Sequence, residues 1–529
     1  MNKICRVVFR RRVFVILILL IQIGFPIFLL LGLDSYAWYA PIVLSAVSIG
    51  VCVHVVNRQA KAAYKITWIF LILLFPIFGG IMYIIFHSQS TSRRFKRQTD
   101  RVAAESRDAF FIGGDCQAQF ALERPEFEPQ SRFLRDRGGF PVFAGTQAEY
   151  LPSGEGFHAR LLEELEKARR YIFLEFFIIR EGTMFGSILS ILERKAREGL
   201  DVRLIYDDLG CFFTLPADFR ATMEAKGIKC LVFNPFRPVL SSLQNHRNHR
   251  KIVAIDGMVA FTGGANIGDE YINAVERFGN WKDAAIMLEG AGAWSFALIF
   301  LQMWNASAGA GRRRGRRADG FDYGAFHPQA WLPQEERQTA SGALTGGTRG
   351  YVQPYADSPI DKEHLCENVY LHLIGRARKY VYINTPYLIL DDGLLSALTL
   401  AAKSGVDVRI ITPHRWDKWI VAVASRSYYR QLILAGVKVY EYSRGFNHGK
   451  TFVCDDAVAT VGTANLDFRS LYLHFECGVV VYGGDAVRDI RDDFMRTVPV
   501  SREIAPGECS RNLLHRALSD VLRIFAPLM

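Results

Sequence analysis

The segment ARRYIFLEFFI at residues 168–178 recurs later in the chain as ARKYVYINTPY at residues 377–387. Two more pairs keep the same order: AREGLDVRLI at 196–205 with AKSGVDVRII at 402–411, and AKGIKCLVF at 225–233 with LAGVKVYEY at 434–442. Each pair joins the end of a helix to an apolar run that is typical of a buried strand. The period is far longer than that of a solenoid repeat. The sequence therefore predicts an α/β fold made of two homologous sandwich lobes.

Each repeat carries one copy of the pattern HxKxxxxD. The copies are His249, Lys251 and Asp256 in HRKIVAID, and His448, Lys450 and Asp455 in HGKTFVCD. A glycine-led turn with a late asparagine follows each copy, GGAN at 263–266 and GTAN at 462–465. A single copy could arise by accident, and a lone histidine beside a strand is usually structural. Two copies at matched positions of a duplicated fold are the strongest signal in the chain, and they form the candidate catalytic set.

The spacing within each motif suggests phosphodiester chemistry. Residues two apart on a strand point the same way, so each histidine and its lysine project from one face. Two symmetric lobes would bring both pairs to one cleft, where the lysines with Asn266 and Asn465 can bind phosphoryl oxygens. One imidazole can attack phosphorus, and the other can protonate the departing alcohol and deprotonate the incoming one. We therefore expect a covalent phosphohistidine.

Four carboxylates accompany the motifs. Asp283 in NWKDAAIML and Glu476 in LHFECGVVV lie on expected returning strands, and we expect them to orient His249 and His448. The alternative is that both are surface acids at strand ends. Asp256 and Asp455 are expected to be structural, because their spacing points them away from the His-Lys face. No carboxylate cluster suggests a divalent ion, so we expect catalysis without metal or cofactor.

The N-terminal part of the chain is strongly apolar. Residues 13–33, 40–56 and 66–86 are predicted membrane segments, and basic residues flank them. A signal peptide is the alternative for the first, but its apolar run is too long and no small-residue cleavage site follows. Pro76, Gly79 and Gly80 make the third segment the candidate for an irregular one. Three full crossings cannot keep every basic flank on one side, so the anchor is expected to have two to three transmembrane segments and its topology stays open. The basic flanks and the free cysteines favour the cytoplasmic side for the catalytic part.

Composition narrows the class of partner. The chain has 529 residues, a net charge of +11 and a mean hydropathy of +0.09. A basic protein suits nucleic acid or acidic lipid, and the apolar N-terminus favours lipid over nucleic acid. The nine cysteines are scattered without a CxxC pair, which indicates reduced thiols rather than a disulfide framework or a zinc site.

The same patterns divide the chain into six parts. They are a membrane anchor at 1–90, a basic linker at 91–130, a first lobe at 131–305, a linker at 306–350, a second lobe at 351–500 and an amphipathic C-terminal helix at 501–529. The second linker is rich in Gly, Ala and Arg and contains RRRGRR at 312–317. That cluster is usually a solvated surface, and contact with a phosphate or lipid headgroup is the alternative.

The duplicated motif with its GGAN and GTAN turns resembles the phospholipase D superfamily, over roughly residues 130–529. The blocks NHRKIVAIDG, FTGGANIGDEY, GNWKD, NHGKTFVCDD and TANLDFRSLYLHFE, with the apolar region at 40–86, resemble bacterial cardiolipin synthases. The resemblance implies that a phosphatidyl group passes from one phosphatidylglycerol to another and releases glycerol. It also implies that His249 is the nucleophile and His448 the acid and base.

Three rival functions remain at this point. A phospholipase D-type hydrolase would use the same residues with water as acceptor, and a nuclease of this kind would have no use for apolar segments. A phosphatidyltransferase with another donor or acceptor, such as phosphatidylethanolamine, is equally compatible with the motifs. A membrane scaffold with a degenerate domain would need a broken motif, whereas both motifs are intact.

Overall fold

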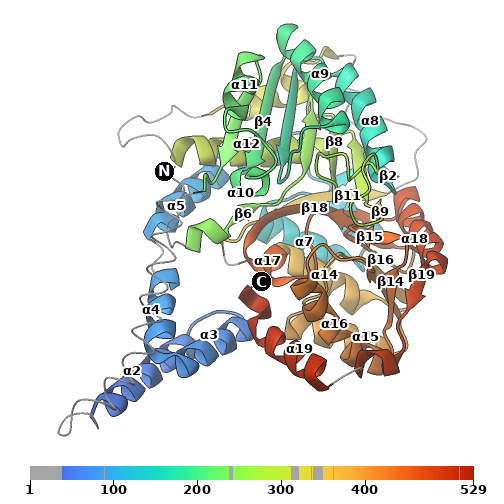
Figure 1. Cartoon of the computed structure of the whole chain (residues 1–529). Helices are drawn as coiled ribbons and strands as arrows, with labels where there is room; N and C mark the ends of the chain where they lie inside the picture. The colour runs from blue at the N-terminus through green and yellow to red at the C-terminus, as the bar shows by residue number, and fades with distance from the viewer. Residues whose placement is uncertain are drawn as a thin grey trace. The chain divides into compact units, whose positions relative to one another are not determined.

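The computed structural model describes residues 39–87, 90–236, 242–310, 321–334, 336, 350–361, 363–510 and 513–528. The chain divides into two units. The smaller comprises residues 1–93, 236–246 and 520–529, and the larger comprises residues 94–235 and 247–519. The larger unit holds both sequence repeats (Figure 1).

The first lobe is built on a seven-stranded sheet. Its order is β2 (Gln147–Leu151), β10 (Ala285–Glu289), β8 (Val259–Gly263), β7 (Ile252–Ile255), β3 (Tyr171–Phe176), β4 (Asp201–Asp207) and β5 (Lys229–Phe233). The last three strands run parallel, and β7, β8, β10 and β2 pair antiparallel. The helices of this lobe are α8 (Gly154–Lys167), α9 (Thr183–Arg197), α10 (Asp208–Cys211), α11 (Phe219–Ala225) and α12 (Ala293–Ala310).

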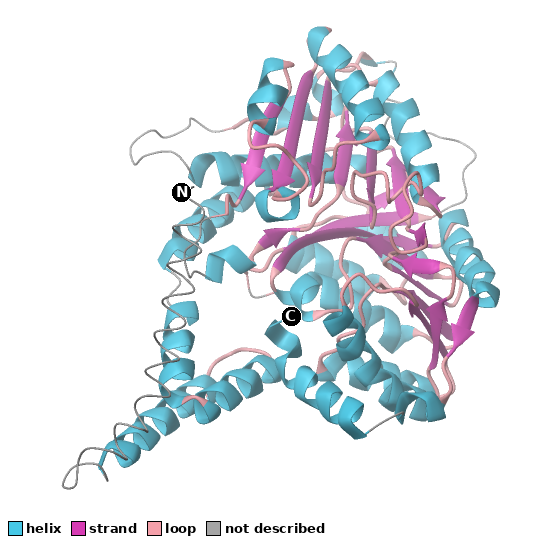
Figure 2. Ribbon diagram, viewed as in Figure 1, coloured by secondary structure: helices cyan, strands magenta, loops and turns pink. Residues whose placement is uncertain are grey.

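The second lobe repeats this order with additions at its edges. Its sheet runs β1 (Phe143–Ala144), β11 (Tyr351–Asp357), β18 (His474–Tyr482), β17 (Val458–Gly462), β16 (Thr451–Cys454), β12 (Tyr380–Asn384), β13 (Asp407–Pro413), β14 (Lys438–Tyr442) and β19 (Ser501–Glu503). Its helices are α14 (Leu365–Arg376), α15 (Asp392–Lys403), α16 (Trp419–Leu434), α17 (Phe468–Tyr472) and α18 (Asp485–Thr497). Figure 2 shows the two sheets with helices around them. The predicted duplicated α/β fold is confirmed.

Alternation along β3 explains how the first lobe is packed. Ile172 and Leu174 belong to the apolar core shared with α8 and α9. Phe173, which lies between them in the chain, points to the other face and stacks on Phe300 of α12, with 4.7 Å between ring centroids. Because both faces of the sheet are covered, its strands are apolar on both sides, as the sequence showed.

The first linker differs from its prediction. Residues 91–130 were expected to be a basic linker, but they form most of α5 (Ser90–Ser106), the 3-10 turn Asp108–Phe111, α6 (Gln117–Glu123) and the start of α7 (Glu128–Gly138). Phe120 is fully buried against Tyr351 and Tyr482 of the second lobe. The single buried aromatics of this segment are widely spaced among charges, so its composition resembled a linker.

Lobe boundaries also shift from those expected. The strand β1, at the start of the predicted first lobe, pairs with β11 of the second sheet. The side-chain amide of Gln353 donates to the carbonyls of Ser131 and Phe140, which ties this stretch to the second lobe as well. Residues 306–310 of the predicted second linker are the last turn of α12, and Tyr323 and Leu332 are buried. The RRRGRR cluster lies outside the described residues.

The smaller unit contains α2 (Tyr39–Val56), α3 (Ala62–Leu74) and α4 (Pro76–His87). The third apolar segment is broken between α3 and α4 at Phe75, immediately before Pro76. A side chain on Gly79 would lie 2.5 Å from the carbonyl oxygen of Leu71, so this close turn requires glycine. Among the described residues, no helix combines the length and the apolar character that crossing a bilayer requires. The segment predicted at 13–33 lies outside them.

The C-terminal helix is shorter than predicted. Residues 501–510 form β19 and the 3-10 turn Pro506–Ser510, and α19 covers only Leu513–Phe525. Near its end, the carbonyl of Ile524 accepts a hydrogen bond from the Thr67 hydroxyl, and Phe525 packs on Phe70. The C-terminal end of the chain, which belongs to the smaller unit, therefore packs on α3.

Candidate active site

Each motif histidine is held by a strand from the opposite lobe. The short strand β6 (Arg247–Asn248) pairs in parallel with the start of β18, and the backbone N–H of His249 donates to the carbonyl of Phe475. In the same way β15 (Gly445–Asn447) pairs with β9 (Asn280–Lys282), and the N–H of His448 donates to the carbonyl of Lys282. These two exchanges bring the histidines of the separate repeats to one place.

The exchange makes the histidine-carboxylate pairs cross between lobes. His249 Nδ1 lies 2.9 Å from Glu476 Oε1, and His448 Nδ1 lies 2.8 Å from Asp283 Oδ2. All four side chains are buried. The structure therefore places both predicted carboxylates beside the motif histidines, and neither is a surface acid. Each carboxylate accepts a hydrogen bond from Nδ1–H of its histidine. This fixes the tautomer in which Nε2 carries a free lone pair.

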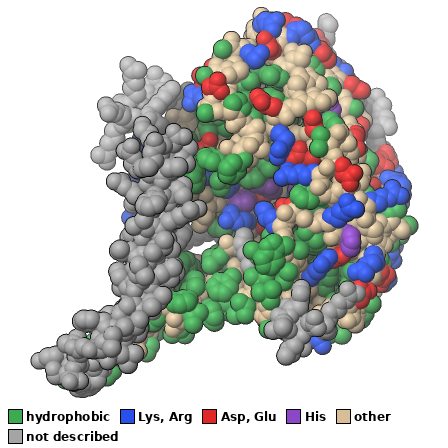
Figure 3. Space-filling view, viewed as in Figure 1, with side chains coloured by type: hydrophobic (Ala, Val, Ile, Leu, Met, Phe, Trp, Pro, Cys, Tyr) green, Lys and Arg blue, Asp and Glu red, His purple; other side chains and the backbone are tan. Residues whose placement is uncertain are grey.

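Aromatic rings enclose both imidazoles. Phe177 lies edge-on to His249 with 5.1 Å between ring centroids. Trp281 lies 5.2 Å from His448 and also donates its indole N–H to Asp283 Oδ2. These contacts restrict both rings to one orientation. Figure 3 shows histidine side chains in a hollow of the surface, beside lysine and arginine side chains.

The two motif lysines lie next to their histidines. Lys251 Nζ donates to the carbonyl of His249 at 2.7 Å, and Lys450 Nζ donates to the carbonyl of His448 at 2.5 Å. Burial lowers the pKa of Lys251 to about 8 and that of Lys450 to about 7. An anion bound between them would favour their charged forms, so the site is prepared for a phosphate group.

The histidines and carboxylates are shifted as well. Burial, with the charge of Lys450 next, lowers the pKa of His448 to about 4, and burial with the nearby lysines lowers that of His249 well below its usual value. Burial raises the pKa of Glu476 to about 7. Asp283 behaves differently: although its burial opposes ionisation, His448 and the nearby Lys450 bring its pKa below the usual range. The two dyads are therefore electrostatically unequal.

A difference between the two turns accompanies this inequality. In GGAN, a side chain on Gly264 would lie 2.1 Å from Asp283 Oδ1, so only glycine fits beside that carboxylate. In GTAN, the matching position is Thr463, whose hydroxyl donates to Glu476 Oε2. Each turn thus supports the carboxylate of its own lobe, which in turn binds the histidine of the other lobe.

The two asparagines of the turns have local partners. Asn266 accepts from the backbone N–H of Ile178 and donates to the Tyr271 hydroxyl. Asn465 donates to Asp467. Each amide nitrogen carries two hydrogens, so one donor of each side chain is left for a phosphoryl oxygen. Their predicted role in binding phosphate stays a prediction.

The motif aspartates serve the backbone. Asp256, in a left-handed conformation with φ of +56°, accepts from the backbone N–H groups of Arg169, Arg170 and Tyr171. Asp455, with φ of +54°, accepts in the same way from Arg378 and Lys379, which precede β12, and from Tyr380, its first residue. Both carboxylates anchor the start of a central strand, so their observed contacts are structural.

Sequence reasoning missed one histidine of the site. The ring centroid of His474 lies 5.5 Å from that of His249, and burial lowers the pKa of His474 well below the usual value. It stands two residues before Glu476, as Trp281 stands two residues before Asp283. Aligning LHFE with NWKD would have pointed to both positions. His249, His474 and Glu476 are the group of described residues whose donor atoms, within 4.8 Å of one another, could hold a metal ion.

That group does not require a metal. His249 Nδ1 already donates to Glu476, and a metal there would occupy the ring expected to react. Catalysis without metal remains a prediction, and it implies that treatment with a chelator leaves turnover unchanged.

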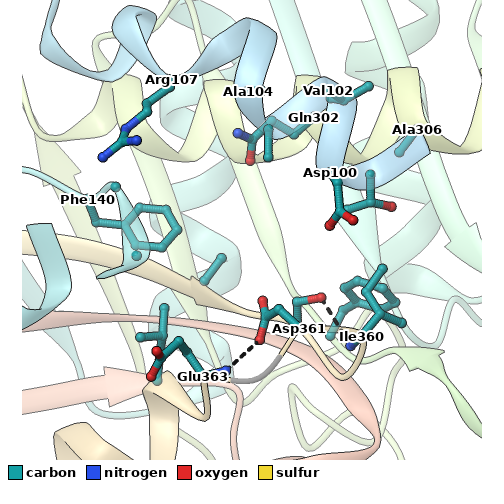
Figure 4. A pocket seen from close by; sticks show the side chains of 18 of the residues that line it. Asp100, Val102, Ala104, Arg107, Phe140, Gln302, Ala306, Ile360, Asp361 and Glu363 are labelled. Carbon is teal, nitrogen blue, oxygen red and sulfur yellow. Dashed lines mark hydrogen bonds between the residues drawn. The ribbon is translucent and has the colours of Figure 1, made fainter. Parts of the chain in front are cut away.

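A separate cavity of about 400 Å³ lies in the larger unit (Figure 4). Arg250 and Phe475, the neighbours of His249 and Glu476 in the chain, form part of its wall. Asp100 of α5, Arg107 just after that helix and Asp361 of the loop after β11 also line it (Figure 4). The cavity thus borders two chain neighbours of the dyad residues.

Two sandwich lobes, in which each His-Lys motif pairs with a carboxylate of the other lobe, define a phospholipase D-type phosphodiester transferase. The family profile described as "Cardiolipin synthase, PLD-like domain" matches residues 161–278 and 370–498, and the one described as "Phospholipase D-nuclease N-terminal" matches residues 46–86. The chain belongs to the cardiolipin synthase family.

Individual relatives agree with this assignment. Cardiolipin synthase 2 of Bacillus anthracis is 35% identical, with 92% of this chain and 90% of that protein covered. An uncharacterized protein of Streptococcus mutans is 41% identical over 91% of this chain and 100% of its own length. The structure of phosphatidylserine synthase from Haemophilus influenzae shares the fold with a TM-score of 0.55, at 15% identity, over 76% of this chain and 98% of that one.

Proposed function

We propose that the protein is a membrane-anchored cardiolipin synthase that transfers a phosphatidyl group from one phosphatidylglycerol to another and releases glycerol. The crossed His249–Glu476 and His448–Asp283 dyads carry this proposal, because they present two imidazole Nε2 atoms with two lysines in one buried site. Likeness to cardiolipin synthases over nearly the whole chain supports the lipid as substrate.

In the first step, His249 Nε2 attacks phosphorus of the donor lipid. The bond between phosphorus and the glycerol headgroup oxygen breaks, and His448 Nε2 gives that oxygen its proton. In the second step, the hydroxyl of another phosphatidylglycerol gives its proton to His448 and attacks phosphorus. The N–P bond then breaks, and His249 is restored. Lys251 and Lys450 stabilise the charge on the phosphoryl oxygens throughout.

The unequal dyads support this division of roles. Asp283 has a lowered pKa and stays ionised, so it favours the protonated form of His448 that an acid needs. The pKa of His448 is about 4 in the free protein, and a bound phosphodiester anion raises it toward working pH. Glu476, with a pKa of about 7, is the weaker anion and holds His249 as a neutral nucleophile with Nδ1–H directed at the carboxyl group.

The anchor is assigned to the N-terminal region. α2, α3 and α4 are rich in exposed apolar side chains, among them Ile42, Val47 and Leu73. A bilayer would cover these side chains, and it would also hold both substrates. We infer a membrane location with the larger unit on the cytoplasmic side, where the cysteines remain reduced. The eight cysteines in the described part of the chain are all free.

Product analysis tests the proposal. Purified full-length protein is incubated with phosphatidylglycerol in mixed micelles, and the lipid and water-soluble products are measured. We expect cardiolipin and glycerol in equal amounts, and none from the His249→Ala variant. Phosphatidic acid as the main product would replace the synthase with a hydrolase, and turnover that requires phosphatidylethanolamine would change the donor.

A further inference from the structure

Two short segments of the larger unit expose large apolar side chains. Phe213 is 91% exposed and Trp419 is 64% exposed. Phe213 follows the last residue of β4 by six positions (207 to 213), and Trp419 follows the last residue of β13 by six (413 to 419). These strands are equivalent in the two repeats, so the two aromatics occupy matching places in the two lobes. A neighbour of each is also exposed, Leu209 at 41% and Ile420 at 38%.

The first segment is fixed to the residues that cover His249. Gly210 lies against the carbonyl of Phe177, because a side chain there would come within 2.1 Å of that oxygen. The Thr214 hydroxyl donates to the carbonyl of Ile179 at 2.6 Å. The ring of Phe177 in turn contacts that of His249. Phe213 is therefore held in a rigid segment at the site, and its exposure does not come from a loose loop.

The second segment approaches the same histidine from the other lobe. The Tyr387 hydroxyl donates to Asp417 at 2.7 Å, which fixes the chain just before Trp419. The charge of the exposed Lys418 is near enough to contribute to the lowered pKa of His249. Both exposed aromatics thus belong to segments next to the histidine pair, one on either lobe. Figure 3 shows hydrophobic side chains on both sides of the hollow that contains the histidines.

The chemistry of these segments fits a lipid surface. Exposed Trp and Phe side chains are typical of surfaces that lie at a membrane interface, and Trp419 also stands next to the exposed Lys418. The segment of Phe213 supplies apolar side chains and no basic residue, and it carries the acids Asp208 and Asp218. The second segment carries the exposed Lys418, which suits anionic headgroups, while its exposed His414 and Arg415 pair with Glu441 and Glu276. Exposed aromatic side chains could also bind a partner protein. A bilayer is favoured because the lipids that react must enter this same hollow from a membrane.

We propose that Phe213 and Trp419, one from each lobe, insert into the surface of an anionic bilayer and hold the mouth of the catalytic hollow against it. The inference rests on the proposed function for the identity of the lipid, and it adds a second membrane contact besides the N-terminal anchor. Insertion at two matched points would orient both His-Lys pairs toward headgroups in one leaflet.

Kinetics on two forms of one substrate test this surface. The double variant Phe213→Ser/Trp419→Ser is reconstituted as full-length protein in vesicles of phosphatidylglycerol and phosphatidylcholine. We expect its rate to fall by roughly tenfold or more, since each large side chain contributes strongly when it leaves water. On monomeric dibutyryl phosphatidylglycerol in detergent, the rate should equal that of the wild type.

Matched controls are exposed leucines outside the two segments. Leu122 of α6 is 85% exposed and Leu400 of α15 is 67% exposed. The variants Leu122→Ser and Leu400→Ser should keep the wild-type rate on both substrates. A wild-type rate for the double variant on vesicles would overturn the inference. An equal loss on vesicles and on monomers would also overturn it, because the change would then lie in the site itself.

A second measurement does not depend on turnover. Subtracting the emission of a Trp419→Phe protein from that of the wild type isolates the fluorescence of Trp419. In vesicles of acyl-brominated phosphatidylglycerol, we expect this signal to be quenched. An unquenched signal would exclude insertion, and binding of a protein partner would then be the better explanation of the exposed aromatics. If the wild type made no cardiolipin, the proposed function would fail while this result still decided the membrane contact.

Discussion

At the scale of single residues, the site depends on which carboxylate holds which histidine. The motif histidines and lysines were predictable, because the repeat supplied two copies of one pattern. The exchange of Glu476 and Asp283 between lobes was not, because chain order places each carboxylate after the motif of its own repeat. Only the pairing of short segments such as β6 with β18 reveals it.

Neutralising either carboxylate should reduce the chemical step. Glu476→Gln and Asp283→Asn keep the size of each side chain but remove the charge that fixes the ring tautomer. We expect kcat to fall by roughly 10²- to 10⁴-fold, with KM changed little. Steady-state kinetics on mixed micelles measures this. Glu441→Gln is the control, because Glu441 is a buried acid that pairs with His414 outside the site; a comparable kcat loss there would show that the effect is not specific to the dyads.

The lowered pKa values of the two lysines predict how kcat/KM falls at alkaline pH. In the free protein the pKa of Lys251 is about 8 and that of Lys450 about 7. As pH rises through these values the lysines lose the charge that attracts phosphate, so kcat/KM should decline between about pH 7 and pH 9. A bound anion raises both pKa values, so kcat should decline at a higher pH than kcat/KM. A kcat/KM that stays constant to pH 9.5 would contradict this assignment.

At the scale of elements, alternation and apolar runs predicted β3, β4, β12 and β13 well. Segments with few apolar residues are harder to predict. The composition of residues 91–130 predicts a basic linker, yet this stretch forms α5 and α6, and Phe120 fills a fully buried position against the second lobe. No sequence pattern pointed to α12, whose apolar side chains pack on the first sheet and whose Trp294 indole N–H donates to the carbonyl of Ala109 in the 3-10 turn Asp108–Phe111.

The GGAN turn gives a prediction at this scale. Gly264→Ala would place a methyl group 2.1 Å from Asp283 Oδ1 and 2.8 Å from the His448 carbonyl. Because one of these neighbours is backbone, the dyad must shift, and we expect kcat to fall by at least roughly tenfold.

Gly449→Ala is the matched control for that variant. It lies in the second motif, but the nearest atom to an added methyl group is Ala284 Cβ at 3.5 Å, which is an ordinary contact. Its rate should stay within a few fold of the wild type. If both alanine variants had equal rates, the close packing of Gly264 would have no catalytic importance.

At the scale of the whole molecule, the duplication is what produces the site. Neither lobe alone contains a complete dyad, since each supplies a histidine and the carboxylate for the other. Sequence could predict that the repeats meet, but not that the dyads are unequal. Burial dominates at Glu476 and raises its pKa, whereas at Asp283 the neighbouring His448 and Lys450 outweigh burial, and this balance follows from the packing of the two lobes.

The central claim is that the reaction passes through a covalent intermediate on His249. Protein with His448→Asn, which retains the nucleophile but lacks the acid and base, is mixed with phosphatidylglycerol labelled at phosphorus, quenched under alkaline conditions and digested for mass spectrometry. The account predicts a labelled phosphatidyl group on the His249 peptide, formed slowly and resolved more slowly still, and none in His249→Ala. Label on His448 of the wild type, or rapid turnover by His249→Ala, would contradict it.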